Sequence, residues 1–78
     1  MFEVNDVVRF KDNNIPVEIL GVITRVDSKD YVQILAENGK TYSAAYVGYL
    51  KPTEYKMPIS NLLDEFARIK RLEDHNAR

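Results

Sequence analysis

The feature that most constrains the fold is a series of short β-type segments that alternate with turn signals between residues 6 and 52. Each segment is rich in Val, Ile, Leu or aromatic residues and is bounded by Asn, Asp, Ser, Gly or Pro. The segments cover residues 6–10, 17–26, 31–36, 40–45 and 49–51. Pro52 ends the last one, because proline has no backbone N–H to donate. This order and spacing predict a mainly β fold, a five-stranded small barrel over residues 1–52.

Two glycines mark places where the backbone of this predicted barrel needs special geometry. Asn38-Gly39 favours a type I′ hairpin turn between segments 31–36 and 40–45, because both residues accept a positive φ. Gly21 interrupts the long second segment and predicts a bulge or a corner where that strand bends. Residues 44–48 are too short and mixed for another strand, which suggests a 3₁₀-like crossover. Val32, Ile34 and Ala36 alternate, so they should share one buried face.

From Ile59 onward the apolar period changes from two to about 3.6. The pattern predicts an amphipathic α-helix over residues 59–75, joined to the barrel by a linker at 53–58. Its apolar stripe consists of Leu62, Leu63, Phe66, Ile69 and Leu72. Two interpretations of the stripe stay open: it packs on its own barrel, or it docks on another chain, as a homodimer or in a partner's groove.

Length and composition indicate one globular domain of 78 residues, with 45% hydrophobic and 29% charged residues. The absence of cysteine excludes disulfides, thiolate metal sites and a thiol nucleophile. No apolar stretch approaches the roughly 20 residues of a membrane span, and the N-terminus lacks the pattern of a signal peptide. We therefore expect no membrane association and a cytoplasmic protein.

The charge balance argues against a dedicated nucleic-acid module. Residues 1–52 hold six bases and seven acids, and the whole chain carries a formal net charge of −1. A protein that binds the phosphate backbone usually shows a basic excess, since each neutralised phosphate needs a nearby cation.

Catalysis has little support in the sequence. His75 is the only histidine and lies near the C-terminus among acidic residues, so no serine has a base at plausible spacing. Neighbouring acids on a helix point in different directions and form no shared acid/base site. A glycine-rich phosphate loop and a metal-ligand spacing are also absent. We expect no enzyme activity, no cofactor and no metal.

Tyrosine is concentrated in one part of the chain, where four of the five tyrosines fall within residues 42–55. Tyrosine is enriched at interfaces, because it offers a large apolar area and a hydroxyl at a low cost in rotamer entropy. We therefore predict a protein-binding surface, with the alternative that two or more of the rings only close the barrel and seat the helix. Its residues are Tyr42, Tyr46, Tyr49 and Tyr55, flanked by Arg9, Asn13 and Asn14.

The segments that define the strands resemble the SH3-like small barrels of the KOW and Tudor types. The resemblance is carried by residues 4–8, 21–26, 31–34, 38–42 and 49–52, and it spans residues 4–52, about two thirds of the chain. Small proteins of this shape occur in bacteria and their phages. The resemblance implies a noncatalytic protein-binding module, a small accessory or regulatory protein, which includes inhibition of a host or defence factor. The alternative is a KOW/Tudor-like nucleic-acid-binding module that uses the tyrosines with Lys11, Arg25, Lys29, Lys40 and Lys51.

Overall fold

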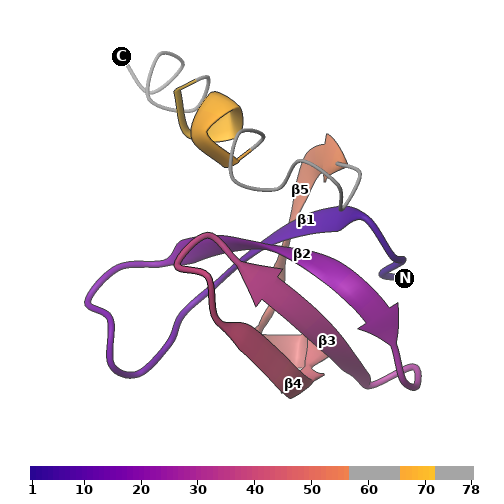
Figure 1. Cartoon of the computed structure of the whole chain (residues 1–78). Coiled ribbons are helices and arrows are strands. Elements are labelled where there is room, and N and C mark those ends of the chain that lie inside the picture. Colours follow the sequence, from indigo (N-terminus) through magenta and orange to yellow (C-terminus); the bar gives the residue numbers. More distant parts are fainter. Residues whose placement is uncertain (57–65, 72–78) are drawn as a thin grey trace.

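The computed structural model describes residues 1–56 and 66–71, which form one antiparallel sheet and a short helical segment (Figure 1). The strands are β1 (Asp6–Phe10), β2 (Ile19–Val26), β3 (Tyr31–Ala36), β4 (Thr41–Tyr46) and β5 (Lys51–Lys56), with a 3₁₀ helix η1 at Val47–Tyr49. The strand order is β4-β3-β2-β1-β5, so β4 and β5 form the two edges. The mainly β class is confirmed, whereas the sheet is not closed into a barrel.

One face of the sheet carries the larger apolar core. Val32, Ile34 and Ala36 of β3 are fully buried there, as their alternation predicts. Leu50, which follows η1, joins the same cluster, and the ring of Tyr42 packs against it. The remaining buried members are Val8, Phe10, Ile19 and Ile23. This core therefore combines side chains of β1, β2 and β3 with Leu50 and with Tyr42 of the edge strand β4.

The opposite face of the sheet is covered by the helical residues 66–71. Phe66 and Ile69 are buried in a cluster with Val7, Leu20 and Val22. The described part of the apolar stripe therefore packs on the chain's own sheet. Leu62, Leu63 and Leu72, together with both ends of the predicted helix, lie outside the described residues.

A polar contact also joins the helical segment to the β3–β4 turn. Lys70 Nζ lies 2.9 Å from Glu37 Oε2, and the Glu37 side chain is only 12% exposed. The other carboxylate oxygen of Glu37 accepts a hydrogen bond from the backbone N–H of Leu20 at 3.3 Å. One turn residue thus contacts both β2 and the segment that covers it.

Gly21 does not lie at a bulge, one of the two features that the sequence predicts there. It pairs with Val8 on one side and Ala36 on the other, and the register shift in β2 lies farther along, between Ile23 and Arg25. A Cβ atom at Gly21 would overlap Cγ2 of Ile34 and lie 2.9 Å from Cε1 of Phe10. Glycine is needed here because two core side chains close over the backbone.

The β3–β4 turn also differs from the predicted type I′ geometry. Gly39 has a φ of +84°, but Asn38 does not have a positive φ. The Gly39 N–H donates to the Ala36 carbonyl, and the Ala36 N–H donates to the Lys40 carbonyl, both at 2.9 Å. This is a three-residue loop, residues 37–39, with a left-handed glycine at its end, the next commonest hairpin connection after the two-residue turns.

The last strand lies later in the sequence than predicted. Tyr49 belongs to η1, and β5 runs through Pro52 to Lys56, so residues 53–56 are strand rather than linker. An edge strand tolerates proline, because one side of its ladder needs no donor. The register between β1 and β5 shifts next to Val7, whose carbonyl accepts a 2.7 Å hydrogen bond from the Thr53 hydroxyl. The predicted 3₁₀ crossover is confirmed, but it starts at Val47.

Candidate binding groove

A groove of about 260 Å³ lies where the β1–β2 loop, β4 and η1 meet. We call it the tyrosine groove, because three of the predicted tyrosines line it. Its lining residues are Phe10, Lys11, Asp12, Asn13, Tyr42, Ala45, Tyr46, Tyr49 and Leu50. Most of these side chains are apolar or aromatic, and the polar ones come from the β1–β2 loop. Such a lining suits an apolar side chain of a ligand, with polar groups at one rim to orient it.

Tyr42 forms the fixed wall of the tyrosine groove. Its ring meets the ring of Phe10 edge to face, with centroids 5.0 Å apart. Its hydroxyl donates to Asp12 Oδ2 at 2.5 Å and accepts from Asn38 Nδ2 at 3.0 Å. Burial, and secondly the bond to Asp12, raise the pKa of Tyr42. The hydroxyl thus joins the β1–β2 loop to the β3–β4 turn, which makes Tyr42 a structural residue of the groove.

We expect Tyr42→Phe to destabilise the fold at neutral pH, and the loss should shrink in acid. The Tyr42 hydroxyl is the main cause that lowers the pKa of Asp12, followed by the backbone N–H of Asn14. A lowered folded-state pKa contributes stability above the unfolded pKa, about 3.8, and this contribution disappears as the pH falls through the folded value. Urea unfolding of both proteins between neutral pH and pH ~2 measures the difference. A difference that does not change with pH would contradict the assigned contact.

Tyr46 and Tyr49 form the exposed side of the groove. They are 44% and 79% exposed, and their rings meet edge to face with centroids 5.4 Å apart. The Tyr46 ring also lies directly over Gly48, where a Cβ atom would overlap Cε2 and lie 3.0 Å from Cδ2 and Cζ. Glycine at position 48 therefore lets the Tyr46 ring lie against the backbone of η1. Two large rings with exposed surface are available to a ligand here.

Tyr31, which is not among the predicted site residues, extends this aromatic surface. It is 46% exposed, and its ring centroid lies 5.9 Å from that of Tyr46. The two residues face each other because β4 holds one extra residue between the pairs Ile34–Tyr42 and Val32–Ala45. Ala44, with a φ of +55°, lies in this irregularity. Without it, the hairpin register would place Ala45 opposite Tyr31.

Three of the predicted site residues, Tyr55, Arg9 and Asn14, do not line the groove. Tyr55 of β5 packs against the cluster that contains Phe66 and Ile69, on the opposite face of the sheet. Arg9 of β1 and Asn14 of the β1–β2 loop do not line the tyrosine groove, whereas Asn13 does. The structure thus brings together Tyr42, Tyr46, Tyr49 and Asn13.

A second hollow of about 460 Å³ continues the groove and is more polar. Lys11, Asn13 and Tyr49 line both spaces, and Glu18 completes the second one. We call it the lysine hollow. The Glu18 carboxylate lies 2.7 Å from Lys51 Nζ. Its pKa is lowered mainly by the hydrogen bond from Lys51, and further by the charges of Lys51, Arg9 and Lys11.

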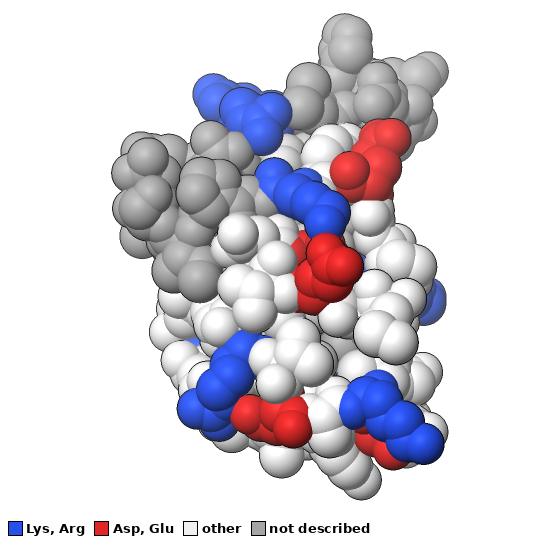
Figure 2. All heavy atoms as spheres, turned by 90° about the vertical axis from the view of Figure 1, so that its right-hand side faces the viewer, with Lys and Arg blue, Asp and Glu red and all other residues white. Residues whose placement is uncertain are grey.

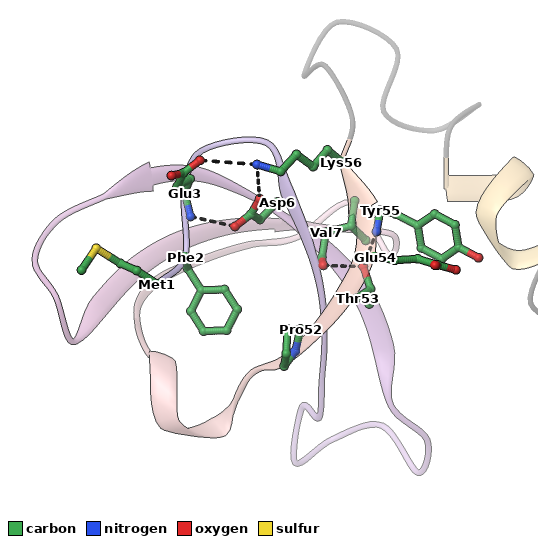
Figure 3. Close-up of a pocket in the computed structure, with 10 residues that line it drawn as sticks. All are labelled: Met1, Phe2, Glu3, Asp6, Val7, Pro52, Thr53, Glu54, Tyr55 and Lys56. Atoms are coloured by element: carbon green, nitrogen blue, oxygen red, sulfur yellow. Dashed lines mark hydrogen bonds and ion pairs between the residues drawn. The ribbon is translucent and has the colours of Figure 1, made fainter.

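A third cavity, of about 400 Å³, lies between the N-terminal segment and β5 (Figure 3). Lys56 Nζ lies 3.4 Å from Glu3 Oε2 and 3.1 Å from Asp6 Oδ1, and Asp6 Oδ2 accepts from the Glu3 backbone N–H. These contacts raise the pKa of Lys56, that with Asp6 most strongly. The two ion pairs of Lys56 fasten the N-terminal segment to the edge strand. We therefore assign this cavity a structural role.

Positive and negative side chains are interleaved on the surface. Figure 2 shows one face of the molecule, on which basic and acidic atoms alternate and form no extended area of one sign among the described residues. Ion pairs involve Arg25 with Asp27, Lys51 with Glu18, Lys56 with Glu3 and Asp6, and Lys70 with Glu37. Much of the positive charge is therefore already neutralised within the chain.

The described part of the chain shows neither a metal site nor a membrane-spanning helix. Within residues 1–56 and 66–71, no group of three or more His, Asp or Glu side chains is placed to hold a metal ion. No helix in that part of the chain is long and apolar enough to cross a membrane. Comparison with family models, with curated proteins and with solved structures finds no significant match to this chain.

Proposed function

We propose that this protein is a noncatalytic protein-binding module whose contact surface is the tyrosine groove. The observation that carries the proposal is the pair of exposed rings, Tyr46 and Tyr49, at the side of an apolar groove whose wall is fixed by Tyr42. Exposed aromatic residues next to a preformed hollow are the usual anchors of protein interfaces.

The proposal extends to the fold type and the biological role. An SH3-like small barrel of the KOW or Tudor type is supported by the order β4-β3-β2-β1-β5 and by the 3₁₀ helix before β5. The size and the balanced charge of the chain fit a bacterial or phage accessory protein that acts in the cytoplasm by docking on a larger protein. In one version of this proposal, the larger protein is a host or defence factor. A homodimer through the helix is not part of the proposal, because Phe66 and Ile69 are buried on the chain's own sheet.

A nucleic-acid-binding module is the second candidate, and one observation favours it. Arg9, Lys11 and Lys51 gather around Glu18, close to the exposed ring of Tyr49. Single-stranded nucleic acids bind where cations flank an aromatic platform. Against this candidate, Lys51 is paired with Glu18, and Lys29 and Arg25, which the sequence suggested as further contacts, line neither of the two hollows.

Affinity capture from an extract of the source organism tests the proposal, with the wild type beside Tyr49→Ala. We expect a protein partner that survives nuclease treatment of the extract and that is strongly reduced with Tyr49→Ala. Thr41→Ala is a matched control, because Thr41 is an exposed residue of β4 that does not line the groove. Capture that depends on nucleic acid, or that is indifferent to Tyr49, would contradict the proposal.

A further inference from the structure

We infer that the ligand of the tyrosine groove is an acidic protein segment, an extended stretch that carries an apolar side chain and a carboxylate a few residues apart. This inference rests on the proposed function and specifies its partner. The apolar side chain fills the groove beside Tyr46 and Tyr49, and the carboxylate lies next to Lys11 in the lysine hollow.

The charges around the lysine hollow favour an acidic ligand. Glu18 is the carboxylate that lines the lysine hollow, and the positive charges of Lys51, Arg9 and Lys11 all act on it. Lys51 is held in the ion pair, whereas Lys11 forms no ion pair or hydrogen bond with the part of the chain that the structure describes. Because Lys51 already pairs with Glu18, the charge of Lys11 is left to attract a further anion in the hollow. A ligand with a carboxylate complements this charge.

The tyrosine groove and the lysine hollow are continuous. Lys11, Asn13 and Tyr49 line both the apolar groove and the polar hollow. A ligand that fills the groove therefore passes directly to Lys11. Because an extended chain advances about 3.3 Å per residue, the two contacts come from one short stretch of the partner.

Two carboxylates beside the groove and the hollow favour a peptide over a nucleic acid as the ligand. A strand of nucleic acid places a phosphate at every nucleotide, but here Asp12 and Glu18 lie at the rim of the same two spaces. These carboxylates would repel successive phosphates, while a peptide with one acidic side chain can avoid them. Asn13, which lines both spaces, offers an amide that can bond to the backbone of an extended peptide.

Selection from a phage-displayed library of random seven-residue peptides tests the inference on the intact protein. We expect the enriched peptides to combine an aromatic or aliphatic residue with Asp or Glu. The best of them, made with a fluorescent label, is titrated against three proteins: wild type, Lys11→Glu and Lys29→Glu. Lys11→Glu should weaken binding roughly tenfold, since repulsion replaces attraction. Lys29→Glu should leave the affinity nearly unchanged, because Lys29 is exposed, lies in the β2–β3 turn and lines neither space.

One outcome of these titrations would contradict the acidic partner alone, and another would also contradict the proposed function on which it rests. If selected peptides bind, lose affinity with Tyr49→Ala and are indifferent to Lys11→Glu, the groove binds protein but the inferred acidic partner is wrong. If selection yields no peptide that depends on Tyr49, the proposed function fails as well. Titration of a labelled oligothymidylate is the remaining comparison, and binding that is tighter than that of the peptides would overturn the inference in favour of a nucleic acid.

Discussion

Ile69→Ala should lower the free energy of unfolding by about 2–5 kcal/mol, the usual cost of truncating a large aliphatic side chain in a core. Ile69 has no exposed surface and lies in one cluster with Val7, Leu20 and Val22. A loss of this size is a large fraction of the total stability of a small domain, about 5–15 kcal/mol. Urea denaturation followed by circular dichroism measures it.

Arg71→Ala is the matched control for Ile69→Ala, because Arg71 is an exposed residue of the same helical segment. Its substitution should change the stability by about 0.5 kcal/mol or less. Equal losses for the two variants would show that the segment at 66–71 does not pack on the sheet in solution. The apolar stripe would then be available to another chain, which was the second interpretation of the sequence.

Gly21→Ala should also be strongly destabilising, by about 1–3 kcal/mol or more. The new methyl group would overlap Ile34 Cγ2 and approach Phe10 Cε1 to 2.9 Å, and both side chains are buried. Gly39→Ala meets no atom within 4 Å, but its φ of +84° gives a backbone penalty of about 1 kcal/mol. The loss of stability thus has a different cause at each position: a steric clash at Gly21 and an unfavourable backbone conformation at Gly39.

A double variant separates these two causes. Ile34→Ala removes the Cγ2 atom that the methyl group of Gly21→Ala would overlap, so the double variant should lose less stability than the sum of the two single variants. Gly39→Ala combined with Ile34→Ala should be additive, because no atom of Ile34 lies within 4 Å of a Cβ at Gly39. Additivity in both pairs would show that the close approach at Gly21 does not exist.

The sequence predicted best those strands whose pattern depends only on their own residues. β1 and β3 have the predicted bounds, and the alternation in β3 identified its buried face. β5 was placed too early, because the rule that proline ends a strand does not hold at a sheet edge, and the edge is a property of the whole sheet. The role of Gly21 was missed for a similar reason, since the atoms that crowd it belong to other strands.

The candidate site was predictable where its residues are close in sequence. Tyr42, Tyr46 and Tyr49 lie in one hairpin arm and the following turn, so proximity alone brought them together. The positions of Tyr31 and Tyr55 relative to the groove depend on tertiary structure. The extra residue in β4 places Tyr31 beside Tyr46. Tyr55 packs against the cluster of Phe66 on the opposite face of the sheet, away from the groove. The register shift in β4 and the position of residues 66–71 on the sheet cannot be read from one sequence.

Titration of the captured partner at low and physiological salt, with wild type, Tyr49→Ala and Gly48→Ala, tests the central claim most directly. A methyl group at position 48 would displace the Tyr46 ring, so it changes the groove without removing a tyrosine. We predict that each substitution weakens binding by at least about 1–2 kcal/mol, as truncated anchors do, and that wild-type affinity changes little with salt. Affinity that falls steeply with salt and is indifferent to both substitutions would contradict the claim, because it is the behaviour of a nucleic-acid-binding protein.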